Sequence, residues 1–204
     1  MRIHVSVETE GEPLAESKLD VYVRGSARAL CVFRAGRQSG RKVLIVGERV
    51  WLIIPGTKHP IPVTPNQRLL GGASIADVAR LDLAEEFDGF VFDAAETVDG
   101  VACNALELRA RSGKSPYASG TAWLGVRDGI VRKLRLSLPS GKEAKEIRFV
   151  AYGQDAGRTV LRRMEIRHLL RSEHGMRTVL EFIDYEPQTL GDEFFDPARA
   201  QALP

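Results

Sequence analysis

The chain has 204 residues, the length of one ordinary domain. Its 44% hydrophobic and 27% charged residues are typical of a folded globular protein and exclude a disordered chain. A formal net charge of +2 excludes the strongly basic surface of most nucleic-acid-binding proteins.

The first residues alternate between apolar and polar side chains, as a strand does, and do not form the apolar centre of a signal peptide. A strand beginning at Arg2 is unusual as the natural start of a chain. We therefore expect an upstream segment before Met1. No apolar run approaches the ~20 residues that a membrane-spanning helix requires.

Period-two alternation continues along the chain and predicts strands with one apolar and one polar face. The predicted strands are residues 2–8, 19–24, 27–34, 42–47, 49–54, 59–64, 89–98, 101–110, 119–127, 130–138, 144–152, 158–168 and 176–185. Glycine-containing turns separate many of them, at 46–48, 98–100, 127–129 and 139–141. Such short connections predict antiparallel neighbours, because parallel strands need a crossover of about a dozen residues.

One stretch departs from this alternation. Ser74 followed three residues later by Asp77 resembles a capping box and predicts a short helix over residues 74–81. Its apolar positions, which suit one helical face, are Ile75, Val78, Ala79 and Leu81. A second, shorter helix is expected over residues 83–87.

Arginines alternate with apolar residues over 158–167, as they do in some RNA-binding sheets. Val160, Met164 and Ile166 fall on one face of this strand, which favours an ordinary amphipathic strand with a mixed-charge outer face. Arg162 falls on the apolar face, where we expect it to reach a rim or to pair with an acid.

No catalytic or metal-binding motif is present. The histidines lack metal-ligand spacing, and the sequence has no H-E-x-x-H motif, G-x-S-x-G elbow or phosphate-binding glycine loop. The sequence therefore predicts no enzyme, no cofactor and no metal. Cys31 and Cys103 both lie in predicted strands, which favours buried free thiols over a disulfide.

Apolar side chains exceed what these few helices can cover. The most regular apolar rows are Ile130, Leu134, Leu136 and Leu138, then Ile147, Phe149 and Ala151, then Leu180 and Phe182. A sheet that curls can bury such rows as a filled barrel core, or around a hollow that holds a ligand. The pattern alone leaves both possibilities open.

Two blocks of the sequence resemble a known family. Gly47–Pro55 reads GERVWLIIP, and Gln67–Arg80 follows the pattern Q-R-x-x-G-x-x-(S/T)-x-x-D-hydrophobic-x-R. Together they resemble the central motif of the LolA-like outer-membrane lipoprotein-sorting proteins, in the lipoprotein-carrier superfamily. Val21–Gly25 and the late pair Phe194 and Phe195 extend the resemblance over most of the chain.

This resemblance implies a mainly β protein in one domain over residues 1–204, with a single curved antiparallel sheet. The sheet would be an open half-barrel of about 11 strands with short helices as a lid. The resemblance also implies a signal peptide and a helix upstream of Met1, and a periplasmic location.

The implied function is a carrier that binds the acyl chains of lipids or lipoproteins in an apolar cavity for transport to the outer membrane. Its partners would be the acyl cargo, an inner-membrane exporter and an outer-membrane acceptor, with no nucleic acid, and we expect a monomer. The cargo need not be a lipoprotein. An alternative is an accessory module that docks on an envelope exporter without cargo. A third reading, an enzyme acting on lipids, lacks a polar triad.

The candidate lining consists of apolar side chains, because each buried methylene contributes about 0.8 kcal/mol without any directional bond. The candidates are Trp51, Ile53, Ile75, Val78, Leu81, Phe90, Phe92, Leu134, Leu136, Phe149 and Phe182. Arg68 and Asp77 are expected to lock the helical lid.

Overall fold

The computed structural model describes residues 2–9, 17–64, 68–70, 73–74, 83–112, 115, 117–170 and 177–202. Within these ranges the side chains of residues 2–9, 68–70, 73–74 and 92–94 are not described. The chain forms two compact units. Unit 1 contains Met1–Leu81 and Thr178–Pro204, and unit 2 contains Asp82–Arg177.

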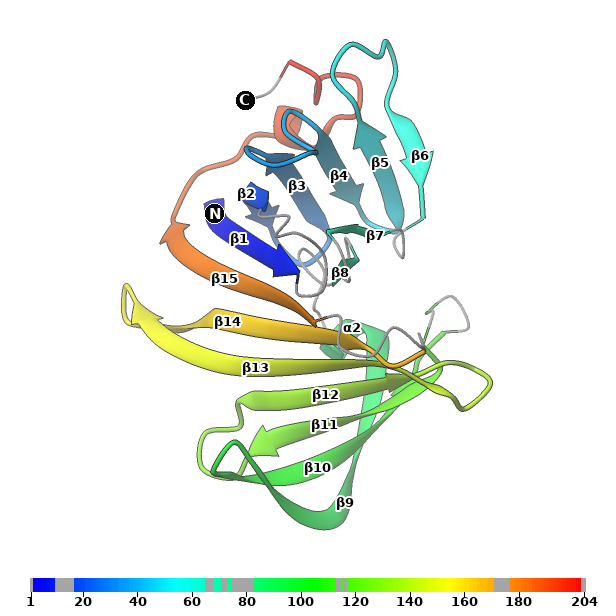
Figure 1. Cartoon of the computed structure of the whole chain (residues 1–204), viewed down its shortest axis with the longest axis vertical. Helices are drawn as coiled ribbons and strands as arrows, with labels where there is room; N and C mark the ends of the chain where they lie inside the picture. Colours follow the sequence, from blue (N-terminus) through cyan, green and yellow to red (C-terminus); the bar gives the residue numbers. More distant parts are fainter. Residues whose placement is uncertain are drawn as a thin grey trace. The chain divides into compact units, whose positions relative to one another are not determined.

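Unit 1 is built on an antiparallel sheet with the strand order β6-β5-β4-β3-β2-β1-β15 (Figure 1). Its strands are β1 (Arg2–Thr9), β2 (Ser17–Arg24), β3 (Arg28–Phe33), β4 (Lys42–Val46), β5 (Arg49–Ile53), β6 (Ile61–Val63) and β15 (Arg177–Glu186). Two short strands, β7 (Arg68–Leu70) and β8 (Ala73–Ser74), pair with each other. A single turn of 3-10 helix, η1 (Asp192–Phe195), lies in the C-terminal segment that follows β15.

Unit 2 begins with the short helix α2 (Leu83–Glu86), followed by strands in the spatial order β9 to β14. These strands are β9 (Phe87–Val98), β10 (Val101–Ala110), β11 (Ser119–Gly125), β12 (Val131–Ser137), β13 (Glu143–Asp155) and β14 (Arg158–His168). Each pairs antiparallel with the next along the chain. Among the described pairings, β9 is hydrogen-bonded only to β10, so it is an edge strand.

Every predicted strand is present, and β10 and β14 match their predicted limits at both ends. The helix expected over 83–87 is α2. Ser74, the expected helix cap, lies in β8, and the rest of the predicted helix, residues 75–81, lies outside the described residues. A mainly β, antiparallel fold is therefore confirmed.

The tight turns follow from the residues at their centres. Asp99 and Gly100 join β9 to β10 with φ values of 50° and 80°. Two successive positive φ angles match the twist of the flanking strands, and Asp-Gly is the pair that tolerates them best. Predicted turns at 46–48, 127–129 and 139–141 are also observed as connections between strands.

Both faces of the unit 1 sheet are apolar. The first, here called the covered face, carries Tyr22, Leu30, Val32, Leu44 and Ile53, which pack with Leu190, Phe195 and Ala200 of the C-terminal segment. The opposite side, the second face, includes the buried side chains of Leu19, Val21, Cys31, Phe33, Val43, Ile45 and Leu52. Alternate residues of the same strands therefore enter two separate apolar layers.

Unit 2 has one apolar face and one charged face, and the charged face also carries a small buried cluster of Val98, Cys103, Ala105 and Trp123. The register aligns Leu134, Ile147 and Ile166 across β12, β13 and β14, and all three are 0% exposed. On the other side of the same strands, the neighbouring register pairs are Arg135 with Glu146 and Arg148 with Glu165. This is the half-buried antiparallel sheet that period-two alternation predicts.

Cys31 and Cys103 are free and buried, which confirms the interpretation favoured by the sequence. Burial raises the pKa of the Cys31 thiol to about 12, because a thiolate cannot be solvated there. No group of three metal-ligating side chains occurs within the described ranges. Among the helices described, none is long and apolar enough to cross a membrane.

Candidate functional site

The apolar face of unit 2 is the strongest candidate for a hydrophobic ligand site. It carries Leu106, Leu108, Ala122, Leu134, Leu136, Ile147, Phe149, Met164 and Ile166, which successive register pairs place on one side of the sheet. Three of the predicted lining residues, Leu134, Leu136 and Phe149, lie on it and are buried. These side chains can contact an acyl chain only through dispersion and the hydrophobic effect.

A charged residue, Lys145, is buried on this apolar face. Lys145 lies opposite Leu136 on β12 and His168 on β14, and it is 1% exposed. Its Nζ atom is 5.5 Å from the centre of the Tyr117 ring, within the range of a cation–π contact. The sequence carried a signal for this position, since Lys145 has the same alternation phase as Ile147 and Phe149.

Trp51 and Ile53 lie on the covered face of unit 1. Ile53 is 3% exposed, and Trp51 packs beside it against the cluster that includes the C-terminal segment. Arg49 lies with its guanidinium 5.9 Å from the Trp51 ring. The structure thus places these two candidates against the protein's own C-terminal segment.

The phenylalanine candidates fall in different places. Phe182 is buried in β15, on the Leu19 side of the unit 1 sheet, because both residues pair with Val5. Phe90 is 50% exposed and pairs with Glu107, so it lies on the opposite side of β9 from the apolar face. Its ring is 5.2 Å from the Arg109 guanidinium. Phe92 lies in β9, and its side chain is not among those described.

The lid candidates are mostly outside the described residues. Ile75, Asp77, Val78 and Leu81 fall in a range that the structure does not describe. Arg68 begins β7 and pairs with Ser74, but its side chain is likewise not described. The lid and its lock therefore stay predictions.

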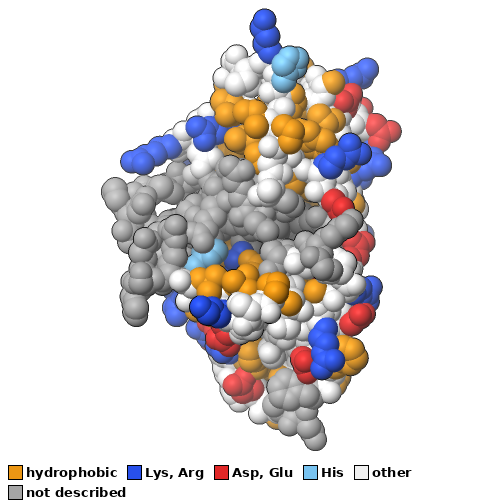
Figure 2. Space-filling view, turned by 90° about the vertical axis from the view of Figure 1, so that its right-hand side faces the viewer, with side chains coloured by type: hydrophobic (Ala, Val, Ile, Leu, Met, Phe, Trp, Pro, Cys, Tyr) orange, Lys and Arg blue, Asp and Glu red, His pale blue; other side chains and the backbone are white. Residues whose placement is uncertain are grey.

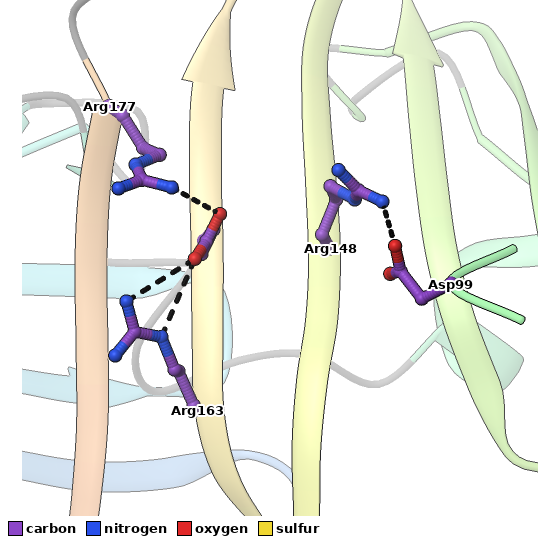
Figure 3. A network of polar contacts seen from close by, with 5 residues as sticks. Asp99, Arg148, Arg163 and Arg177 are labelled. Carbon is purple, nitrogen blue, oxygen red and sulfur yellow. Dashed lines mark hydrogen bonds and ion pairs between the residues drawn. The ribbon is translucent and has the colours of Figure 1, made fainter.

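The charged face of unit 2 is organised by ion pairs. The carboxylate of Glu165 accepts from Arg177 at 3.0 Å and from Arg163 at 3.4 Å, and Arg148 reaches Asp99 at the β9–β10 turn (Figure 3). Arg135 donates to Glu146 at 2.8 Å, and this bond raises the pKa of its guanidinium. Because these arginines have acidic partners, the face does not match the uncompensated basic surface of a nucleic-acid-binding sheet.

Arg162 behaves as expected from its position on the apolar side of β14. Its Nη2 atom is 4.0 Å from Asp155 Oδ1 and donates to the Gln154 carbonyl oxygen at 3.5 Å. Nearby, the Tyr152 hydroxyl donates to the Val131 carbonyl oxygen at 2.6 Å. Burial raises the pKa of this phenol to about 12, which keeps it a donor at any physiological pH.

Sequence reasoning missed the contacts that hold the C-terminal segment. Lys42, buried on the covered face, donates from Nζ to the carbonyl oxygens of Ala200 and Gln201, each at 3.1 Å. Arg24 donates to the Leu190 carbonyl oxygen at 2.8 Å and also bonds Asp192. The only signal in the sequence was the pair Phe194 and Phe195, because a single 3-10 turn shows no periodicity.

Apolar side chains also reach the surface. Among the larger ones, the edge strand β9 exposes Phe90 and Val91, and Val91 is 79% exposed. Figure 2 shows further hydrophobic side chains at the surface on the side that it views. By register Val91 lies on the same side of the sheet as Leu106, so the apolar face of unit 2 reaches solvent at its β9 edge.

The fold is similar to those of three solved structures, one of them a LolA superfamily protein. A LolA superfamily protein from Nitrosomonas europaea matches with a TM-score of 0.84 and 20% identity, over 96% of this chain and 89% of that chain. A DUF1329 family protein from Desulfovibrio piger matches with a TM-score of 0.81 and 18% identity, over 96% and 88%. An outer membrane lipoprotein-sorting protein domain from Vibrio parahaemolyticus gives a TM-score of 0.79 and 16% identity, over 98% and 90%.

A family model also matches the sequence over residues 25–200. Its description reads "-like: Uncharacterized protein", and the chain belongs to this family. No curated protein matches the sequence. The resemblance inferred from the two sequence blocks is thus confirmed as a LolA-like fold.

Proposed function

We propose that this protein is a carrier that holds the acyl chains of lipids or lipoproteins and moves them through the periplasm to the outer membrane. The observation that carries the proposal is the continuous apolar face of unit 2 on a LolA-superfamily fold. The outer membrane lipoprotein-sorting domain from Vibrio parahaemolyticus has the same fold, which supports this choice of cargo.

The mechanism is hydrophobic transfer. Each methylene that moves from water to an apolar face contributes about 0.8 kcal/mol. An acyl chain of about ten or more methylenes therefore gains enough binding free energy to be retained. Release requires either a competing site or displacement of the side chains that cover the face. In our proposal the sheet is an open half-barrel, and the part of the predicted helix that follows Ser74, residues 75–81, is its lid, locked by Arg68 and Asp77.

The remaining parts of the proposal concern partners and location. The protein works as a monomer, receives cargo from an inner-membrane exporter and delivers it to an outer-membrane acceptor. It performs no catalysis. Two predicted lining candidates, Trp51 and Ile53, lie on the covered face of unit 1. They have a smaller part in binding, because they pack in the same cluster as the C-terminal segment.

A matched pair of phenylalanines tests where the acyl chain binds. Phe149 lies buried on the apolar face, and Phe90 lies half exposed on the other side. We expect Phe149→Leu to weaken binding of a fluorescent fatty acid and Phe90→Leu to leave it unchanged. Equal effects of both substitutions would remove the apolar face of unit 2 as the binding surface.

Native mass spectrometry with organic extraction of protein from a bacterial envelope tests the carrier function itself. Co-purified acyl lipid or lipopeptide near one per chain is the expected result. A protein without lipid that also fails to bind the fluorescent fatty acid would contradict a carrier.

The second candidate is a module that docks on an envelope exporter without cargo. It is favoured by the edge strand β9, whose exposed Phe90 and Val91 could pack against a strand added by a partner. Loss of exporter binding on Val91→Lys, in a protein that binds no lipid, would favour this function.

A further inference from the structure

The position of Lys145 adds a polar end to the apolar face of unit 2. The residue lies in the row formed by Leu136, Lys145 and His168, next to the row formed by Leu134, Ile147 and Ile166. It is among the largest fully buried side chains of the protein. Lysine is almost never fully buried unless its charge is compensated, because removing an ammonium from water is costly.

The chemistry around Lys145 allows it to recognise an anion. Tyr117 offers the face of its ring at 5.5 Å, which stabilises the ammonium. An ammonium has three donors, so protein contacts and a ligand oxygen can share it. A ligand carboxylate or phosphate would form a charge-assisted bond that the dry surroundings strengthen.

The apolar residues extend from this cation in one direction. Ile147 and Phe149 follow Lys145 on the same side of β13, and Met164 lies opposite Phe149 on β14. Four residues of strand span about 13 Å at the usual rise per residue. A ligand with a charged head at Lys145 can therefore lay a stretch of its acyl chain along Ile147 and Phe149.

We propose that Lys145 binds the anionic head group, a carboxylate or phosphate, of an acyl lipid whose chain lies on the apolar face of unit 2. This inference rests on the proposed carrier function and specifies its ligand as an anionic lipid. It assigns the Lys145 end of the face to the head group and the Phe149 end to the chain.

The test measures displacement of a fluorescent fatty acid by matched pairs of charged and neutral lipids. Palmitate is compared with hexadecanol, and dipalmitoyl phosphatidic acid with dipalmitoylglycerol. We expect the wild-type protein to prefer the charged member of at least one pair. The pair that shows the preference distinguishes a carboxylate head from a phosphate head.

Variants then assign the preference to Lys145. Lys145→Met should weaken binding of the preferred charged lipid by about tenfold, the loss of one charge-assisted hydrogen bond, and leave the neutral lipid unchanged. Lys145→Arg keeps the charge and should retain the preference. Lys133→Met is the control, because Lys133 lies on the charged face with its Nζ atom 3.9 Å from the Trp123 ring. Thermal melts of each variant establish that it is folded.

The outcomes separate the two proposals. If charged and neutral lipids bind equally well, or if Lys145→Met keeps the preference, the assignment of Lys145 is wrong and the carrier function stands. If no lipid binds the wild-type protein, the carrier function is contradicted, and the assignment of Lys145 is overturned with it.

Discussion

The two units bury apolar residues in different ways. In unit 1 both faces of the sheet are apolar, and the C-terminal segment covers one of them through Leu190, Phe195 and Ala200. In unit 2 one face is apolar and the other carries arginines with acidic partners. A sheet with two apolar faces requires two covering layers, whereas a charged face can stay in water. Unit 1 should therefore depend on a distant part of the chain in a way that unit 2 does not.

The largest expected effect on stability comes from the C-terminal segment that packs on the covered face of unit 1. Phe195 is 5% exposed, and Phe195→Ala should lower the free energy of unfolding by about 3 kcal/mol. The neighbouring Phe194 is only partly buried, so Phe194→Ala should cost less, about 1 to 2 kcal/mol. Urea unfolding measures both. Equal losses would mean that the C-terminal segment does not hold unit 1 through Phe195.

The next effect concerns the charged face of unit 2. The side chain of Glu165 is 10% exposed and bonds both Arg163 and Arg177, so Glu165→Gln should lower stability by about 2 kcal/mol. Glu143 is the matched control, because it pairs with Arg135 while 53% exposed. Glu143→Gln should change stability by less than about 0.5 kcal/mol. A large effect of Glu143→Gln would show that exposed pairs also contribute to this face.

A smaller effect is expected at Lys42. Lys42→Met removes two hydrogen bonds to the C-terminal segment and should lower stability by about 1 kcal/mol. Faster hydrogen exchange should be confined to the amides around residues 190–202. Faster exchange throughout unit 2 would contradict the separation of the two units.

The smallest effect depends on pH. Arg24, through a hydrogen bond, and Arg28 lower the pKa of the exposed Asp192 carboxyl in the folded protein. A lowered folded-state pKa stabilises the protein above the ordinary aspartate pKa of about 4, and this contribution is lost as the pH falls through the lowered value. Asp192→Asn should therefore lower the Tm slightly at pH 7 and leave it unchanged near pH 2. Equal shifts at both pH values would exclude the charge as the cause.

The sequence predicted the strands well because each strand has one phase of alternation and a turn with characteristic residues. It could not predict which part of the chain packs against each side of a strand. Trp51 and Ile53 were assigned to a lining by their motif, yet they share a face with Lys42 and the C-terminal segment. Alternation reports that a face is apolar, and only the tertiary structure says what covers it.

The candidate site was predicted in part for the same reason. Leu134, Leu136 and Phe149 belong to long amphipathic strands, and the register brings them together. Phe90 lies on the other side of β9 because it alternates with Val91, which pairs with Leu106. Lys145 was missed because a lysine between Glu143 and Glu146 is expected to be solvated. Its place in the alternation of β13 nevertheless matched that of its apolar neighbours.

Each unit contains one buried thiol, Cys31 in β3 of unit 1 and Cys103 in β10 of unit 2. An alkylating reagent can reach either sulfur only when the surrounding strands open. The two labelling rates, read separately from peptide masses, therefore report how often each unit opens in the same molecule. The natural sequence thus carries an internal reporter of partial unfolding for each unit, and no engineered cysteine is required.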